Sequence, residues 1–173
     1  MMILETARLR LREMTDADFD ALAAFLQDSQ VMYAYEGAFS DDEVHAWLQR
    51  RAQERERGDG IGLWAVELKA TGEMIGDCGI TRQATPDGEM LEIGYHLRRD
   101  CWHNGYAVAA ANACKRYAFD VLDAPQVCSI IRSTNVASMN VAIRNGMVVR
   151  GQLVKHYRGV DMPHLVFAVS KNP

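Results

Sequence analysis

One short segment of this sequence has the residue types and the setting that a phosphate-bearing ligand requires. It lies between a strand-like alternating pattern and an alanine-rich pattern of helical spacing, and it reads Trp102-His103-Asn104-Gly105-Tyr106-Ala107. The first amides of a helix have no partner inside the helix, and the helix dipole adds partial positive charge there. Gly105 and Ala107 are small where a backbone must approach a ligand closely. The segment therefore predicts an anion site that suits a pyrophosphate.

The same segment also fits a purely structural strand–turn–helix, in which the glycine only eases the turn. It lacks the lysine and hydroxyl of a phosphate-binding Walker loop, and it lacks the glycine triplet of a dinucleotide fingerprint. Taken alone, the segment leaves the structural reading and the anion site as equal alternatives.

A second pair of polar residues opens the next predicted helix. Asn135 and Ser138 are three residues apart, so their side chains face the same way. Asparagine is also a common helix cap, and capping can coexist with ligand binding. Cys101 lies just before the first segment, but no histidine–carboxylate partner for a nucleophile is evident. The five histidines have no metal-ligand spacing, so we expect no metal site.

The apolar pattern predicts the elements that must position these residues. The expected order is a strand, two helices, three strands, a helix, a strand, a helix and two strands. Their ranges are 8–12, a helix from 15–18, a helix from the capping box Ser40-Asp41-Asp42-Glu43 to Gly58, 63–68, 74–81, 90–97, 104–122, 127–132, 135–145, 147–157 and 163–170.

Hairpin turns constrain how these strands pair. Thr71-Gly72 and Pro86-Asp87-Gly88 are turn signals, so the three central strands should form an antiparallel meander. The strand–helix–strand unit over 90–132 should add one parallel pair. The predicted fold class is α/β of the α+β kind, a mixed and mostly antiparallel sheet of six to seven strands, flanked by about four helices.

Bulk properties narrow the class of protein. The 173 residues suit one domain, 1–173, and 49% of them are hydrophobic. A net charge of −4 without a basic run argues against nucleic acid as the partner. No apolar run approaches the ~20 residues of a membrane span, and no secretory segment is apparent, so we expect a cytoplasmic protein with reduced cysteines.

Read together, the segments resemble the GNAT superfamily of N-acetyltransferases, and most of all its ribosomal-protein alanine N-acetyltransferase branch. The resemblance covers nearly the whole chain. In this branch a tryptophan opens the acyl-CoA loop, as Trp102 does here. The other matching segments are 4–12 as the first strand, Glu92-Ile93-Gly94-Tyr95 as the fourth strand, and Asn135-Val136-Ala137-Ser138 with Arg144-Asn145-Gly146-Met147 as a helix and its end.

The resemblance implies acetyl-CoA as the co-substrate and assigns residues to it. The pyrophosphate would be held by the amides of His103, Asn104, Gly105, Tyr106 and Ala107, following Trp102. The pantetheine arm would lie along the fourth strand, where Leu97 offers backbone. Asn135 would bind the pantetheine or order water near it. Ser138 would lie near the sulfur and could protonate the departing thiolate.

The resemblance also implies direct attack of an amine within a ternary complex. The amine must lose a proton first, and a carboxylate can collect it, often through water. Alternation places Glu92, Gly94 and His96 on one face of the strand, and Glu92 is the preferred base, with His96 a weaker alternative. Tyr33, Tyr35 and Glu36 lie in the link that borders the acceptor site in this family.

The expected function is transfer of an acetyl group to a primary amine. The acceptor could be a protein N-terminus or a small-molecule amine, and a homodimer would not be unusual among similar proteins. The alternative is a non-catalytic acyl-CoA-binding regulatory module on the same fold. A third and weaker reading is another transferase that uses the helix start for a different phosphate ligand.

Overall fold

The structure is a computed structural model that describes residues 1–85 and 88–171. A single mixed sheet carries the fold, with strand order β1-β2-β3-β4-β5-β6-β8-β7. The strands are β1 (Met2–Glu5), β2 (Leu9–Arg12), β3 (Gly62–Leu68), β4 (Met74–Thr85), β5 (Gly88–Leu97), β6 (Gln126–Arg132), β7 (Val148–Tyr157) and β8 (Val160–Ser170). The α-helices are α1 (Phe19–Leu26), α2 (Asp41–Arg57), α3 (Tyr106–Asp120) and α4 (Val136–Arg144).

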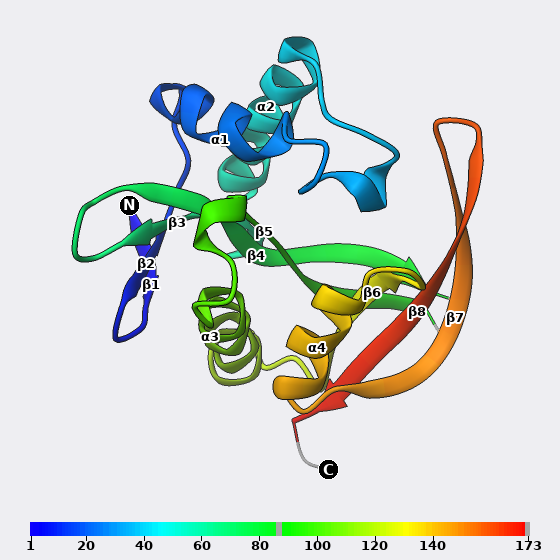
Figure 1. Cartoon of the computed structure of the whole chain (residues 1–173). Helices are drawn as coiled ribbons and strands as arrows, with labels where there is room; N and C mark the ends of the chain where they lie inside the picture. The colour runs from blue at the N-terminus through cyan, green and yellow to red at the C-terminus, as the bar shows by residue number, and fades with distance from the viewer. Residues whose placement is uncertain (86–87, 172–173) are drawn as a thin grey trace.

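The helices cover the two faces of the sheet in pairs. Helices α1 and α2 lie on one face, whereas α3 and α4 lie on the other (Figure 1). Two clusters of buried apolar side chains fill the two layers. One contains Phe25 and Trp47, and the other contains Ile93 and Cys114. Side chains of β5 alternate between the two faces of the sheet. Because Ile93 faces α3, its neighbour Glu92 must face α1 and α2.

The expected fold class is confirmed, with one more strand than expected. The extra strand is β1, which pairs with β2 in an antiparallel hairpin. It has only four residues and no clean alternation, so its pairing with β2, rather than its own sequence, makes it a strand. The one parallel pair is β5 with β6, as expected. The Pro86-Asp87 part of the predicted turn lies outside the described residues, and Gly88 begins β5.

The start and end of α2 follow the predicted local chemistry. The Glu43 amide donates to Ser40 Oγ (3.3 Å), and the Ser40 amide donates to Glu43 Oε2 (2.8 Å). Gly58 ends the helix at φ 64°, a left-handed conformation that glycine adopts without a steric penalty. The expected helix from residue 104 begins instead at Tyr106, because Gly105 at φ 75° caps it.

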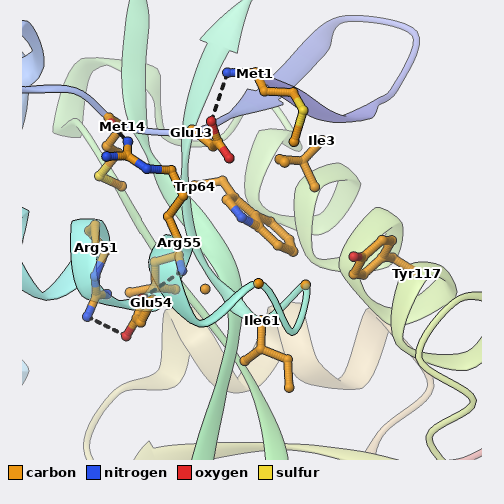
Figure 2. A pocket seen from close by; sticks show the side chains of 14 residues that line it. Met1, Ile3, Glu13, Met14, Arg51, Glu54, Arg55, Ile61, Trp64 and Tyr117 are labelled. Carbon is orange, nitrogen blue, oxygen red and sulfur yellow. Dashed lines mark hydrogen bonds and ion pairs between the residues drawn. The ribbon is translucent and has the colours of Figure 1, made fainter.

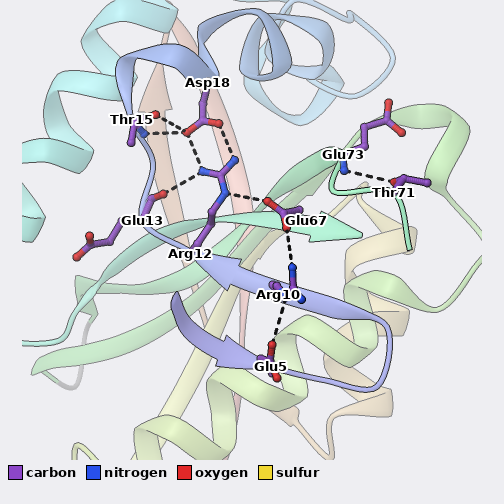
Figure 3. Close-up of polar contacts among 9 residues, drawn as sticks. All are labelled: Glu5, Arg10, Arg12, Glu13, Thr15, Asp18, Glu67, Thr71 and Glu73. Atoms are coloured by element: carbon purple, nitrogen blue, oxygen red, sulfur yellow. Dashed lines mark hydrogen bonds and ion pairs between the residues drawn. The ribbon is translucent and has the colours of Figure 1, made fainter. Parts of the chain in front are cut away.

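A charged network joins the segment before α1 to the sheet (Figure 3). The Arg12 guanidinium donates to both carboxylate oxygens of Asp18 (2.9 and 2.8 Å) and to Glu67 (3.0 Å). Asp18 also accepts from the Thr15 amide at 2.8 Å. Burial acts to raise the pKa of Asp18, but the Arg12 and Thr15 hydrogen bonds outweigh it and hold that pKa below its usual range.

Asp18→Asn should lower the free energy of unfolding by about 1–2 kcal/mol at pH 7, since it removes a charged pair at a partly screened site. Because the folded-state pKa of Asp18 is depressed, its contribution is present above the unfolded value of ~3.9 and is lost as pH falls through the folded value. Urea unfolding at pH 7 and at low pH should show the gap between wild type and variant closing. Asp16→Asn in the same turn is the control, and a gap that stays constant with pH would contradict the assignment.

Candidate active site

The segment that ends in α3 offers a row of backbone amides. His103 and Gly105 adopt left-handed conformations, with φ of 61° and 75°, and together they turn the chain into the helix. Within the described residues, the amides of residues 103–108 have no protein acceptor. Six donors at the positive end of a 15-residue helix form a site for an anionic group.

Side chains of the same loop brace it from within. The Trp102 indole Nε1 donates to the Leu97 carbonyl oxygen at 2.8 Å. Asn104 Nδ2 donates to the carbonyl oxygens of Cys101 (3.2 Å) and Trp102 (2.9 Å). The side chains of Trp102 and Asn104 are therefore engaged by their own loop, and a ligand here would meet backbone. The Leu97 carbonyl oxygen likewise already has one donor.

One arginine at this loop was not predicted as a site residue. Arg8 Nη2 donates to the Asn104 carbonyl oxygen (2.7 Å), and its guanidinium lies 4.6 Å from the centre of the Tyr106 ring. Arg10 and Arg12, the other two arginines of this strand pattern, are each paired with carboxylates. Among the described residues Arg8 has no such partner. Its positive charge can therefore add to that of the row of amides in binding an anion.

A shallow hollow adjoins this row of amides. It gives a bound anion room to continue along the first turns of α3, beside a second arginine. Its lining residues are Thr6, Ala7, Gly105, Val108, Ala109, Asn112 and Arg116.

The parallel pair of β5 and β6 is short. Its register consists of Leu91 with Val127 and Glu92 with Cys128. Beyond it, side chains replace strand pairing. Ser129 Oγ donates to the Ile93 carbonyl oxygen (2.8 Å), and the Ile130 amide donates to Glu92 Oε1 (3.0 Å). The two strands therefore separate from Glu92 onward, toward the end of β5 that leads into the loop.

Backbone of β5 faces this separation. The Ile93 carbonyl oxygen points toward β6, because Ser129 binds it. The His96 amide points toward β4, where it donates to Asp77 at 3.1 Å. Since orientation alternates along a strand, the amide and carbonyl of Tyr95 point the same way as those of Ile93. The backbone amide and carbonyl of Tyr95 therefore lie at the opening, and so do the backbone amide and carbonyl of Leu97.

Glu92 is partly buried at the start of the opening. Burial raises the pKa of its carboxyl, although nearby Lys155, the Ile130 amide and the Thr81 hydroxyl act to lower it. A carboxyl with a raised pKa holds a proton more readily near neutral pH, as a general base requires.

The polar pair of α4 lies on the other face of the sheet. Asn135 caps the helix, since its Oδ1 accepts from the Ser138 amide at 3.1 Å. The Tyr95 hydroxyl donates to the Ser138 carbonyl oxygen at 2.9 Å and so ties α4 to β5. Within the described residues the Ser138 hydroxyl has no hydrogen-bond partner. The structure therefore places Glu92 and Ser138 on opposite sides of the separated strands.

The link between α1 and α2 lies on the Glu92 side. Tyr35 is partly buried, with its hydroxyl 3.1 Å from His96 Nε2. Tyr33 is 41% exposed, and Glu36 forms an ion pair with Arg132 of β6. Of the three predicted acceptor-site residues, Tyr35 alone joins the residues of β5. The ion pair of Glu36 with Arg132 ties the link to β6.

A separate hollow lies where the end of α2 meets β3 and the N-terminus (Figure 2). Its carboxylates are paired, Glu54 with Arg51 at 2.9 Å and Glu13 with the Met1 amino group at 3.0 Å. None of the predicted site residues lines it. It does not belong to the candidate site at the end of β5.

Comparison with known proteins gives this arrangement its family. Residues 8–148 match the model of the acetyltransferase (GNAT) domain. The chain belongs to the GNAT acetyltransferase family.

Relatives and solved structures agree with this membership. YkkB of Bacillus subtilis (strain 168) is 39% identical over 145 residues, which are 83% of this chain and 84% of YkkB. The N-acetyltransferase YoaA of the same organism is 30% identical, over 87% of this chain and 85% of its own. The structure of RimL, a ribosomal L7/L12 α-N-protein acetyltransferase in complex with coenzyme A, is similar in fold, with a TM-score of 0.80, 18% identity and 98% of each chain covered.

As a member of this family the chain is an acetyl-CoA-dependent N-acetyltransferase. Over residues 1–85 and 88–171, no cluster of three or more potential metal ligands is found. In the same part of the chain, no helix is both long and apolar enough to cross a membrane.

Proposed function

We propose that residues 1–173 act as one domain that transfers the acetyl group of acetyl-CoA to a primary amine by direct attack in a ternary complex. One observation carries this proposal: β5 and β6 separate at Glu92, and the opening leads to the row of free amides before α3. An extended acyl carrier with an anionic end would occupy both the amides and the opening. A short phosphate ligand would bind the amides alone and leave the opening empty.

The pyrophosphate of the coenzyme would bind the amides of residues 103–107. Each charged hydrogen bond to such an amide contributes roughly 1.5–3 kcal/mol, so several amides with Arg8 beside them can hold it. The pantetheine arm would follow β5 and use the backbone of Tyr95 and the amide of Leu97 in place of a paired strand. Asn135 would border the arm while it caps α4.

The amine would approach from the Glu92 side. A lysine-type amine with a pKa near ~10.4, or an α-amine near ~8, is mostly protonated at pH 7 and cannot attack in that form. Glu92 is the carboxylate that would collect the proton, and its raised pKa supports this role. We assign the backbone amide of Tyr95 as the donor that would stabilise the negative charge on the carbonyl oxygen of the thioester.

The thiolate would leave on the Ser138 side. The backbone of Ser138 is fixed by Asn135 and Tyr95, which leaves its hydroxyl to meet the sulfur. We assign Ser138 as the proton donor to that thiolate. The acceptor class is a primary amine, either a protein N-terminus, as in RimL, or a small molecule. Tyr33 and Glu36 would shape its entrance.

The direct test has two stages. Isothermal titration should show binding of acetyl-CoA, and release of free thiol should then follow in a panel of peptide N-termini, polyamines and amino sugars. Absence of binding at millimolar acetyl-CoA would overturn the proposal. Binding without turnover on any amine would favour the non-catalytic module.

Glu92→Gln should lower kcat by about 10²–10⁴-fold, the usual contribution of a general base, with the Kd of acetyl-CoA unchanged. In the wild type kcat should rise as pH increases through the raised pKa of Glu92, and the variant should lose this limb. Glu89→Gln is the matched control, because Glu89 lies on the same strand and pairs with Arg82 at the surface. A Glu92→Gln enzyme with wild-type kcat would exclude Glu92 as the base.

Arg8→Gln should raise the Kd of acetyl-CoA by roughly three- to tenfold, and the loss should shrink as salt screens the charge. Titrations at low and high ionic strength would measure it. Arg10→Gln removes a comparable exposed arginine that is already paired with Glu5, so its Kd should stay at the wild-type value. Equal effects of the two substitutions would mean that Arg8 acts only through net charge.

A further inference from the structure

A buried carboxylate lies on the face of the sheet that α1 and α2 cover. Asp77 of β4 is 0% exposed, yet its two oxygens accept three hydrogen bonds. Trp47 Nε1 of α2 donates to one oxygen at 3.1 Å, while the His96 amide (3.1 Å) and His96 Nδ1 (2.8 Å) donate to the other. A buried charge is expensive unless it is hydrogen-bonded in this way. Neither the proposed coenzyme site nor the proposed base uses it.

The network determines where its protons lie. Because an ionised Asp77 can only accept, His96 Nδ1 must carry a hydrogen. In neutral imidazole the other nitrogen then carries the lone pair, so Tyr35, whose oxygen is 3.1 Å from Nε2, donates to it. The Tyr35 oxygen keeps its own lone pairs. Among the described residues it accepts no hydrogen bond, so it can receive one from a ligand.

Tyr35 is held firmly in this position. Arg132 of β6 donates to the carbonyl oxygens of Tyr33 and Ala34 (3.3 and 3.4 Å), which fixes the backbone before Tyr35. The Tyr35 ring packs edge-on against Phe39 and Tyr157. The hydroxyl therefore has a defined direction, as a proton-transferring group needs.

On this face of β5, the residue between Glu92 and His96 is a glycine, Gly94, which has no side chain. Glu92, Gly94 and His96 alternate on one face of β5, and a Cβ placed on Gly94 would meet only Leu63 Cδ2, at 3.9 Å. Glu92 and His96 are four residues apart, about 13 Å along a strand. An amine above Gly94 thus has Glu92 on one side and the Tyr35–His96 pair on the other.

The reaction itself calls for two proton acceptors. An alkylammonium ion that becomes an amide loses two protons from nitrogen, one before attack and one after it. One proton is finally matched by the thiol that forms, and the other goes to solvent. A single carboxylate that took the first proton would still be occupied when the second is released.

We propose, on the basis of the acetyl transfer proposed above, that Tyr35, His96 and Asp77 form a proton relay that takes the second proton. The Tyr35 oxygen contacts the acceptor nitrogen. As the N–H bond breaks, a new O–H bond forms on Tyr35, and the original Tyr35 proton moves to His96 Nε2. The positive charge comes to rest on the imidazolium beside Asp77, which acts as a positioning residue. After the product leaves, the same path returns the proton to solvent through Tyr35.

Tyrosine stays neutral throughout this transfer. Burial raises the pKa of Tyr35, and the negative charges of Glu92 and Asp77 raise it further, so a tyrosinate is not formed. The charged and titratable groups around the relay come from several elements. They are Asp77 on β4, Glu92 on β5, Tyr157 on β7, and Arg50 and Arg51 on α2.

Tyr35→Phe is the decisive variant, since it keeps the ring packing and removes only the transferring oxygen. It should lower kcat by about 10–100-fold, leave the Kd of acetyl-CoA unchanged and alter the shape of the pH–kcat profile. Tyr117→Phe is the matched control and should keep wild-type values, because Tyr117 packs against Trp64 and lines the separate hollow. Tyr35→Phe combined with His96→Gln should be no slower than the slower single variant, because both interrupt one path.

The outcomes separate the relay from its alternatives. If the wild type shows no turnover with any amine, the acetyl transfer itself fails. If the wild type is active and Tyr35→Phe keeps its kcat and its pH profile, the relay is wrong. A rise in KM or a loss of thermal stability with an unchanged kcat profile would show that Tyr35 only packs. Multiplicative effects of the Tyr35 and His96 substitutions would also overturn the single path.

Discussion

The separation of β5 from β6 is the constraint on which the rest of the site depends. A parallel pair normally continues by backbone hydrogen bonds, but here a serine hydroxyl and a glutamate carboxylate take their place after two residues. These two bonds satisfy backbone groups that would otherwise be buried without partners. They also take the place of further backbone pairing between β5 and β6 toward the loop. The opening is thus a built feature of the sheet, and Glu92 both helps to form it and faces into it.

The polar network around Asp77 is arranged at a cost to stability. Asp77 and Arg51 are both buried, yet they are not hydrogen-bonded to one another. The guanidinium of Arg51 instead lies 4.8 Å from the centre of the Trp47 ring, whose Nε1 donates to Asp77. Two Arg51 nitrogens, Nε and Nη1, have no hydrogen-bond partner in the described part of the chain. Burial lowers the pKa of Arg51 accordingly. An apolar packing of this layer would be simpler, so the retained charges are better explained by the chemistry of His96 and Tyr35.

The sequence predicted the features that depend on interactions between residues close together in the chain. The Ser40–Glu43 capping box and Gly58 bounded α2, and the alternation around Ile93 predicted that Glu92 and Ile93 lie on opposite faces of β5, because each depends on neighbouring residues alone. The short strand β1, Arg8 and Asp77 were missed for the opposite reason. Arg8 meets Asn104 96 residues away, and Asp77 meets His96 and Trp47 19 and 30 residues away. Such contacts exist only after the sheet forms, and a single aspartate within an apolar strand carries no local signal of its partners.

The sheet itself separates the two kinds of proton chemistry that the proposed transfer needs. Glu92 and Tyr35 lie on the α1–α2 face, and Ser138 lies on the α3–α4 face beside the Tyr95 hydroxyl. Groups that must accept protons and a group that must donate one would pair with each other if they shared a cavity, and each would then lose its function. With the separated strands between them, they would meet, in the proposed transfer, through a substrate whose thioester lies in the opening. In the proposed transfer the amine and the thiolate would occupy opposite faces, with direct attack from one face and departure on the other.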